Sequence, residues 1–272
     1  MQTFKPILGL LLLLGCLNLS AQSSQPEYKV MIHTNMGSVK IKLYNSTPYH
    51  RNAFLKLVDE KHFDGTLFYR VVKNFVIQGG SSDSRNAAAG KHIGYGSENH
   101  LISAEFKPEF FHKKGALCAP RQPENVAEFK ISDISQFYIV QGRTYTNAEL
   151  DMIEKSRNTP IMIDLKTRYY LPFKDELKNL KSTDPETFNK RLKEIKEKID
   201  FEYTLSNKLE FTPEQRIGYN TMGGCPDLDF DYTVFGEVIE GLSVIEKIAA
   251  LPVDKNNRPY TDVKITVQIV IN

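Results

Sequence analysis

The chain has 272 residues, which is enough to bury a substantial core in one large domain or in one ordinary domain with an elaboration. Its hydrophobic fraction of 41% and its charged fraction of 25% are ordinary for a soluble globular protein. A formal net charge of +2 argues against charge-driven binding of nucleic acid, so composition predicts a soluble protein and no more.

The N-terminal segment has the parts of a secretory signal. Lys5 precedes a nearly unbroken apolar run from Ile7 to Leu17, and small residues follow the run at Ser20 and Ala21. The run is shorter than the roughly 20 apolar residues that a membrane-spanning helix needs. We therefore predict that residues 1–21 are a signal peptide and are not part of the fold.

Two cleavage sites compete within this signal. Leu13 to Cys16 resembles the lipobox of bacterial lipoproteins, whereas Leu19 to Ala21 resembles an ordinary signal-peptidase site. A lipid on Cys16 would anchor the protein to a membrane of the cell envelope, and cleavage after Ala21 would release a soluble periplasmic protein. Both alternatives predict export.

Alternating apolar residues predict a β-hairpin at the start of the mature chain. Apolar side chains recur at every second position from Tyr28 to Thr34 and from Gly37 to Tyr44, which is typical of strands with one buried face. Thr47 and Pro48 then mark the start of a helix of about three turns.

Short strand-like runs recur along the rest of the chain. A second helix is expected from Leu242 to Ala249, where apolar residues share one face. Many short strands with two helices predict a mainly β protein, built as a closed β-barrel with helical ends. The further predicted strands are Leu67 to Val72, Asn74 to Gln78, Ala116 to Ala119, Phe137 to Gln141, Thr233 to Val238 and Val263 to Ile271.

Residues 143–220 have a helical and strongly charged pattern instead. Capping boxes mark helix starts at Thr146 and Thr212, and a third helix should begin at Pro185. We interpret this segment as a solvated helical insertion; the alternative is an arm that binds clients or partners. The third helix carries an apolar stripe that would pack the insertion: Phe188, Leu192, Ile195 and Ile199.

Two cysteines of the mature chain show no metal-ligand spacing. Cys118 lies in an apolar run and Cys225 in a loop rich in Gly and Pro, without a CxxC pair. An oxidising compartment would permit a disulfide between them, but two unpaired buried thiols are an equal alternative.

The segment from Phe63 to Gly80 contains an unusual charge. Arg70 stands in a run of strand-forming apolar residues, five positions before Phe75 and eight before Gln78. This segment resembles the signature of the cyclophilins. Three later blocks resemble the family in the same order, and the resemblance covers residues 28–142 and 221–272. The later blocks are Tyr95 to Leu117, Ser135 to Val140 and Leu228 to Gly236.

The resemblance implies an eight-stranded antiparallel barrel, capped by two helices, with an active site on its outer surface. By position, Arg70 matches the catalytic arginine, and Gln78 matches the glutamine that orients it and the substrate. The substrate-binding positions that the resemblance implies are Phe75, Val76, Pro120, Arg121, Gln136, Phe137, Tyr138, Leu228 and Tyr232.

An arginine suits the chemistry that this family performs. Rotation about a peptide bond has a barrier of about 18–20 kcal/mol because the nitrogen lone pair is delocalised into the carbonyl. A guanidinium that donates a hydrogen bond to the prolyl nitrogen stabilises the twisted transition state more than either planar state. No metal, nucleotide or other cofactor is required. The six histidines need no catalytic role, and His112 is interpreted as a surface residue beside Lys113 and Lys114.

Several positions depart from the family pattern. Tyr69 stands in place of the usual histidine before the catalytic arginine, Tyr138 replaces a common phenylalanine, and Pro120 replaces a small residue. Asp227 occupies the position where many eukaryotic members have a tryptophan that binds cyclosporin. An aspartate offers neither the area of an indole nor its N–H donor, which argues against cyclosporin sensitivity.

The main interpretation is therefore an exported peptidyl-prolyl cis-trans isomerase, a rotamase that speeds protein folding and acts as a monomer on proline-containing polypeptides. The rival is a non-catalytic cyclophilin-fold chaperone or a module that only binds proline-containing peptides. A metal or nucleotide enzyme has no supporting motif. Because connectivity should bring the ends of the insertion together, we also expect a short linker to replace residues 143–220 without loss of activity.

Overall fold

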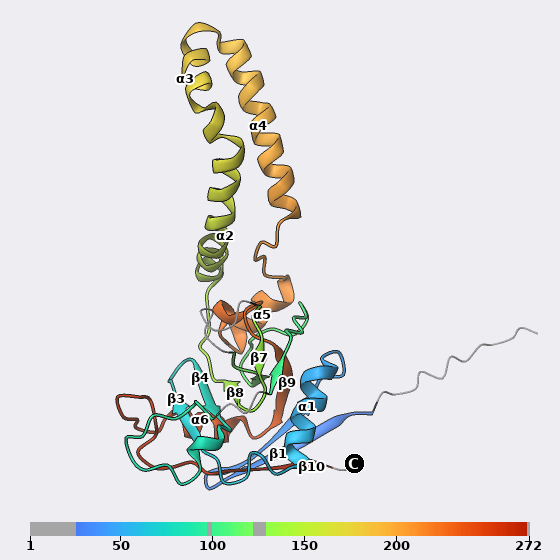
Figure 1. The fold of residues 1–272 in the computed structure, drawn as a ribbon, viewed down its shortest axis with the longest axis vertical. Coiled ribbons are helices and arrows are strands. Elements are labelled where there is room, and N and C mark those ends of the chain that lie inside the picture. The colour runs from blue at the N-terminus through green and yellow to red at the C-terminus, as the bar shows by residue number, and fades with distance from the viewer. Residues whose placement is uncertain (1–25, 97–99, 122–128, 271–272) are drawn as a thin grey trace, which may run out of the picture.

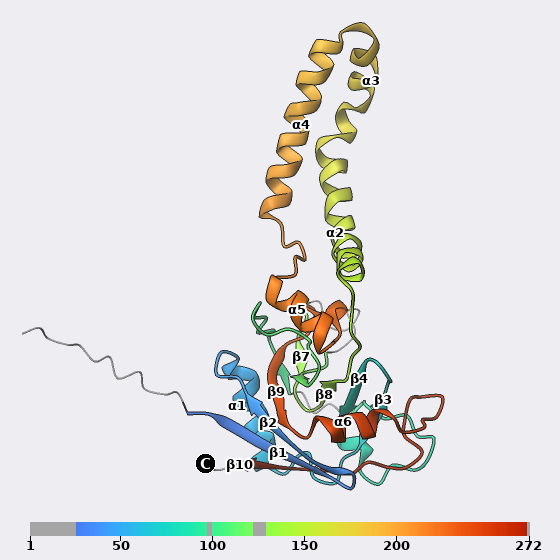
Figure 2. The same ribbon diagram turned by 180° about the vertical axis from the view of Figure 1, so that it is seen from behind.

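The structure is a computed structural model that describes residues 26–96, 100–121 and 129–270. It has two parts, a β body and a long helical arm that projects from it (Figures 1 and 2). The predicted signal peptide, including Cys16, lies outside the described residues. No helix within the described ranges is long enough and apolar enough to cross a membrane.

The β body is built on one antiparallel sheet of eight strands, in the order β10-β1-β2-β9-β6-β8-β4-β3. The predicted N-terminal hairpin is present, with Val30 opposite Ile41 and Ile32 opposite Val39, all four fully buried. The eight strands are β1 (Tyr28–Thr34), β2 (Gly37–Leu43), β3 (Phe68–Val71), β4 (Val76–Gly79), β6 (Ala116–Cys118), β8 (Phe137–Val140), β9 (Val234–Glu240) and β10 (Ile265–Val270). Two short strands, β5 (Leu101–Ile102) and β7 (Ser132–Asp133), pair separately.

The sheet is curled, so that its two outer strands approach each other. The Phe68 N–H donates to the Val263 carbonyl at 2.9 Å, and the Ile265 N–H donates to the Thr66 carbonyl at 2.8 Å. Between β3 and β10 themselves the described residues form no ladder. The predicted mainly β fold with eight antiparallel strands is confirmed, whereas the strand pairing does not show full closure.

Two helices contribute to the main core inside the curled sheet, as predicted. Phe54 of α1 (Pro48–Asp59) is fully buried, and its ring centroid lies 4.9 Å from that of Phe63 and 5.8 Å from that of Phe137. Ile245 and Ile248 of α6 (Leu242–Ala249) belong to the same cluster. Each such apolar side chain contributes about 1.5–3 kcal/mol when it is fully buried.

The arm is formed by helices that follow β8. Both predicted capping boxes are confirmed: Thr146 accepts from the Glu149 N–H, Thr212 accepts from the Gln215 N–H, and each partner side chain bonds back. The helices are α2 (Asn147–Tyr169), α3 (Lys174–Thr183), α4 (Pro185–Leu205) and α5 (Pro213–Thr221), with a short 3₁₀ turn η2 (Leu171–Phe173) between α2 and α3.

The apolar stripe of α4 packs inside the arm and not against the sheet. Ile195 and Ile199 are buried together with Leu165 of α2 and Leu177 of α3. The stripe therefore stabilises the arm itself, which is what the interpretation as a solvated helical unit requires. The exact boundaries of the insertion, residues 143–220, stay a prediction.

The two ends of the arm meet at a narrow neck, as the connectivity argument predicted. The Arg143 N–H donates to the Gly224 carbonyl at 3.2 Å, and the Gly224 N–H donates back at 2.9 Å. The neck requires glycine at position 224, because a Cβ there would collide with the carbonyl oxygen of His112. Above it, the base of the arm has its own buried cluster: Leu150, Leu209, Phe211 and Tyr219.

Candidate active site

Three neighbouring strands bring the predicted catalytic residues into one row. Arg70 of β3 lies opposite Gln78 of β4, and Gln78 lies opposite Tyr138 of β8. Directly opposed residues of antiparallel strands have their side chains on the same face. Since Ile77 and Ile139, the next residues along β4 and β8, belong to the main core, the row faces the outer side of the sheet.

A cavity of about 360 Å³ opens over this row. The structure brings nine of the eleven predicted site residues to its walls, from segments that are up to 162 positions apart (70 to 232) in the sequence. They are Arg70, Phe75, Val76, Gln78, Pro120, Arg121, Tyr138, Leu228 and Tyr232. A larger hollow of about 820 Å³ beside Tyr44 and Lys113 contains none of them, so chemistry and not size identifies this site.

The floor of the cavity is apolar. Val76 and Tyr138 belong to a second buried cluster on the outer face of the sheet, against which Phe75, Leu228 and Tyr232 pack. The rings of Tyr138 and Tyr232 meet edge to face at 5.9 Å. A floor of this kind suits a compact apolar ring such as that of proline.

The Arg70 guanidinium stands at the edge of this floor. Its central carbon lies 5.8 Å from the centroid of the Phe75 ring, a cation–π contact. No hydrogen bond or ion pair joins the Arg70 guanidinium to any part of the chain that the structure describes. Its N–H donors are therefore available to a ligand in the cavity.

Gln78 is held by Tyr69 and not by Arg70. The Gln78 side-chain amide donates to the Tyr69 hydroxyl at 2.6 Å, and that hydroxyl donates to Gln136. Gln136 donates in turn to the Gly94 carbonyl at 3.2 Å and to Asp133 at 3.3 Å. Burial raises the pKa of Tyr69 well above its ordinary value, so its hydroxyl keeps the proton that it donates.

Gln136 therefore does not line the cavity; it holds Tyr69, which in turn holds Gln78. It was predicted to bind substrate, but it is buried and its side chain is occupied by these bonds. Tyr69 was identified only as a departure from the family pattern. Strict alternation along β3 would place it on the face opposite Arg70, but the register of β3 against β4 shifts between Phe68 and Arg70, and its hydroxyl contacts Gln78.

The structure corrects the prediction for Phe137. This side chain is fully buried in the main core, where its ring meets those of Phe63 and Phe68 edge to face. Successive residues of a strand point to opposite faces. Because Tyr138 faces the cavity, Phe137 cannot bind substrate from the same strand.

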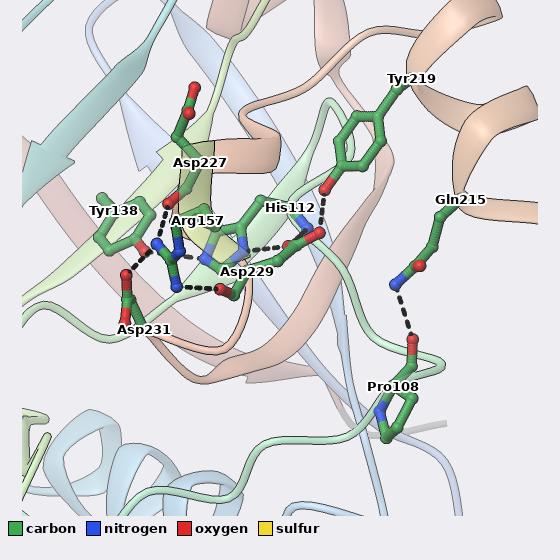
Figure 3. A network of polar contacts seen from close by, with 9 residues as sticks. All are labelled: Pro108, His112, Tyr138, Arg157, Gln215, Tyr219, Asp227, Asp229 and Asp231. Atoms are coloured by element: carbon green, nitrogen blue, oxygen red, sulfur yellow. Dashed lines mark hydrogen bonds and ion pairs between the residues drawn. The ribbon is translucent and has the colours of Figure 1, made fainter. Parts of the chain in front are cut away.

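The surface interpretation of His112 is wrong. The residue is 1% exposed, and its Nδ1 lies 2.7 Å from Asp229 while its Nε2 lies 3.0 Å from the Tyr138 hydroxyl (Figure 3). The Tyr219 hydroxyl donates to the other carboxylate oxygen of Asp229 at 2.5 Å. A buried polar network thus links Tyr138, which lines the cavity, to the base of the arm.

The two cysteines are free and buried. Cys118 is on β6, opposite Tyr138, and Cys225 is at the neck, where its thiol donates to the Phe75 carbonyl at 3.4 Å. Burial raises the pKa of Cys225 to about 12 and raises that of Cys118 as well. Of the two alternatives, the structure has the unpaired thiols. The described residues contain no cluster of side chains that could hold a metal ion.

Comparison with known proteins identifies the family. The model of the family "Cyclophilin type peptidyl-prolyl cis-trans isomerase/CLD" matches residues 29–159 and 174–269, which is most of the chain. The chain therefore belongs to the cyclophilin-type peptidyl-prolyl cis-trans isomerase family, and with it to that class of enzymes. The family predicted from the sequence is confirmed.

Relatives and solved structures agree with this assignment. A protein of Staphylococcus aureus (strain USA300) is 25% identical over 91% of this chain and 93% of its own length, and one of Staphylococcus epidermidis (strain ATCC 12228) is 28% identical with the same coverage. The names of both assign them to the peptidyl-prolyl cis-trans isomerases. The crystal structure of a cyclophilin-type isomerase from Cryptosporidium parvum is similar in fold, with a TM-score of 0.51 at 18% identity, and covers 91% of this chain and 99% of its own.

Proposed function

We propose that the cavity accelerates rotation about X-Pro peptide bonds and that Arg70 stabilises the twisted transition state. The observation that carries the proposal is the position of the Arg70 guanidinium, which has unoccupied donors at the edge of an apolar floor. A module that only binds proline-containing peptides would not need a cation at this edge.

The nitrogen atom of the proline is the group on which the guanidinium would act. As the bond twists, the lone pair returns to nitrogen, which becomes pyramidal and can accept a hydrogen bond from a guanidinium N–H. About 5–6 kcal/mol of selective stabilisation would shorten a process of tens of seconds to milliseconds, at about 1.4 kcal/mol for each factor of ten. Arginine stays protonated at physiological pH, so no proton is transferred.

The rest of the cavity would hold the substrate while the bond rotates. The proline ring would lie on Val76 and Tyr138, and the preceding residues would lie along Pro120 and Arg121. Exclusion of water from this floor strengthens the contact between Arg70 and the prolyl nitrogen. Proline-containing peptides as substrates are supported by the relative from Cryptosporidium parvum, whose structure was also determined in the presence of the dipeptide Ala-Pro.

Gln78 would orient the substrate without touching Arg70. Tyr69 fixes the amide nitrogen of Gln78 at 2.6 Å, so the amide oxygen is left to accept from a backbone N–H of the bound peptide. Fixing one end of the amide in advance reduces the entropy that is lost on binding.

Replacement of Arg70 by alanine tests the mechanism. We expect kcat/KM on a proline tetrapeptide, measured by a protease-coupled assay, to fall by about 30- to 150-fold, which corresponds to about 2–3 kcal/mol of transition-state stabilisation. Thermal unfolding should be nearly unchanged, because no described residue forms a hydrogen bond or an ion pair with the guanidinium. Arg70→Lys should recover little activity, since an ammonium lacks the planar fork.

Wild-type turnover in the folded Arg70→Ala protein would refute the role of Arg70. A wild-type protein that binds the tetrapeptide, by NMR titration, but does not accelerate its isomerisation would favour the binding module instead.

We further propose that the enzyme is exported and acts on exported proteins. This rests on the N-terminal segment, where Lys5 precedes the apolar run from Ile7 to Leu17 and two cleavage patterns follow. Lipidation at Cys16 and cleavage after Ala21 remain the two alternatives.

A further inference from the structure

One wall of the cavity is a tight turn of residues 226–232, which contributes Leu228 and Tyr232. It begins with a 3₁₀ turn, η3 (Pro226–Leu228), and the Tyr232 N–H donates back to the Leu228 carbonyl at 3.3 Å. Phe230, between them, has a φ of 61°, which residues with a side chain rarely adopt. A turn with such a residue needs contacts from outside to hold one geometry.

The arm supplies these contacts through Arg157 of α2. One guanidinium nitrogen donates to the Asp227 carbonyl at 3.2 Å and to the Asp231 carboxylate at 2.5 Å, and the other donates to the Asp229 carbonyl at 3.5 Å (Figure 3). All three acceptors belong to the turn. The planar fork of arginine suits such a contact, because it fixes several acceptors at once in one orientation.

The acceptors alternate with the residues that line the cavity. Asp227 and Asp229 flank Leu228, and Asp231 precedes Tyr232 directly along the chain. A shift of any of these three aspartates would therefore move a wall residue as well. The contact is partly shielded from solvent, since the side chains of Arg157 and Asp231 are 33% and 21% exposed.

Charge also favours this contact. The Asp231 carboxylate is shared by Arg157 and Lys130, whose Nζ lies 2.6 Å away. Burial alone would raise the pKa of Asp231, but the hydrogen bonds from Lys130 and Arg157 outweigh it and hold the pKa below its ordinary value. The carboxylate is thus ionised at neutral pH, where it pairs with Arg157.

A second anchor holds the same turn from the interior. The Asp229 carboxylate accepts from the His112 backbone N–H at 2.9 Å and from the Tyr219 hydroxyl of α5 at 2.5 Å. Arg157 and Tyr219 both come from the helical segment, so the base of the arm forms hydrogen bonds with the turn on two sides.

We propose that Arg157 is a positioning residue for the proline pocket: through it, the base of the arm fixes Leu228 and Tyr232 and thereby sets the affinity of the cavity for substrate. The inference rests on the proposed function for its kinetic consequence, but its effect on peptide binding is independent of turnover.

Arg157→Met tests this, with Arg168→Met as the matched control. Arg168 lies on the same helix, but its ion pairs are with Asp164 and Glu202, inside the arm. We expect Arg157→Met to raise KM, and the peptide Kd from NMR titration, by about five- to tenfold, with kcat changed by less than about twofold. Arg168→Met should leave both constants unchanged. Arg157→Lys should be intermediate, because an ammonium keeps the pair with Asp231 and loses the fork.

The outcomes separate the inference from the proposed function. A wild-type protein without turnover overturns the proposed function, while the peptide Kd of the Arg157 variants still tests the inference. If Arg157→Met matches Arg168→Met in KM and Kd, or lowers only the melting temperature, the inference is overturned. Should Arg157→Met not fold, Asp231→Asn serves in its place: it keeps the side-chain volume, removes the charge, and should raise Kd in the same direction.

Discussion

Removal of the outer arm, which we define as residues 160–205, should leave isomerase activity intact. Residues 160–205 can be replaced by a short Gly/Ser linker, because the two cut ends already lie together. The Asn158 amide donates to the Leu209 carbonyl at 2.8 Å and accepts from the Leu209 N–H at 2.7 Å. This pair lies at the base of the arm and would remain in the shortened protein.

The stability change can be bounded from the packing. The outer arm has its own cluster, which includes Leu165, Leu177 and Ile195, and shares no buried residue with the core of the sheet. Its removal therefore uncovers none of that core. Shortening a connection about eightfold changes its closure free energy by about three times 0.6 kcal/mol. At about 2–4 °C for each kcal/mol in a domain of 150–250 residues, the melting temperature should therefore shift by only about 4–7 °C.

Complete deletion of residues 143–220 should behave differently, contrary to the expectation from sequence. It would remove Arg157, together with Leu150 and Tyr219, which are both fully buried. Loss of the Tyr219 donor alone leaves a buried carboxylate, Asp229, under-satisfied, at about 1–3 kcal/mol. The loss of a buried aromatic side chain adds about 3–5 kcal/mol. We expect this protein to be unstable and to bind peptide poorly.

The assay is kcat/KM on a proline tetrapeptide together with thermal unfolding of both shortened proteins. The short deletion should keep kcat/KM within about twofold of the full chain. If it folds but loses activity on the tetrapeptide, the outer arm contributes to the active site and this reasoning is refuted. Full activity and stability after complete deletion would refute the role assigned to the base.

Two further predictions concern the thiols and the N-terminus. In a chain that starts at Gln22, iodoacetamide at pH 8 should leave native Cys118 and Cys225 unmodified and should label both after unfolding. Burial keeps the two thiols protonated in the native protein and raises the pKa of Cys225 to about 12. Rapid labelling of the native protein would contradict the burial. Intact-mass measurement of envelope fractions should find a mature chain that begins at lipid-bearing Cys16 or near Gln22, and full-length cytoplasmic protein would argue against export.

Local patterns were sufficient for most of the fold. The alternation in residues 28–44 predicted the hairpin, and threonine with Glu or Gln three residues later predicted the starts of α2 and α5. The alternation rule also argues against Phe137 as a substrate-binding residue. Phe137 and Tyr138 are consecutive strand residues, so only one of them can face the cavity.

The buried network could not be predicted from local patterns. His112 stands beside two lysines, which is the pattern of a surface segment, and its partner Asp229 is 117 positions away. The pair of Arg157 with Asp231 spans 74 positions, between a solvated helix and a loop. The first contact depends on how distant segments of the β body pack and the second on how the arm packs against that body, and neither leaves a periodic pattern in the sequence.

The connectivity explains why an arm at this point in the chain contacts the active site. The chain enters the arm directly after β8, which supplies Tyr138, and leaves it directly before the turn that supplies Leu228 and Tyr232. The hydrogen bonds between Arg143 and Gly224 close the neck between these two segments. The base of the arm is thus attached to the floor of the cavity on one side and to its wall on the other. The outer part of the arm has its own buried cluster and makes none of these contacts, so the inner and outer parts should differ in their effect on the enzyme.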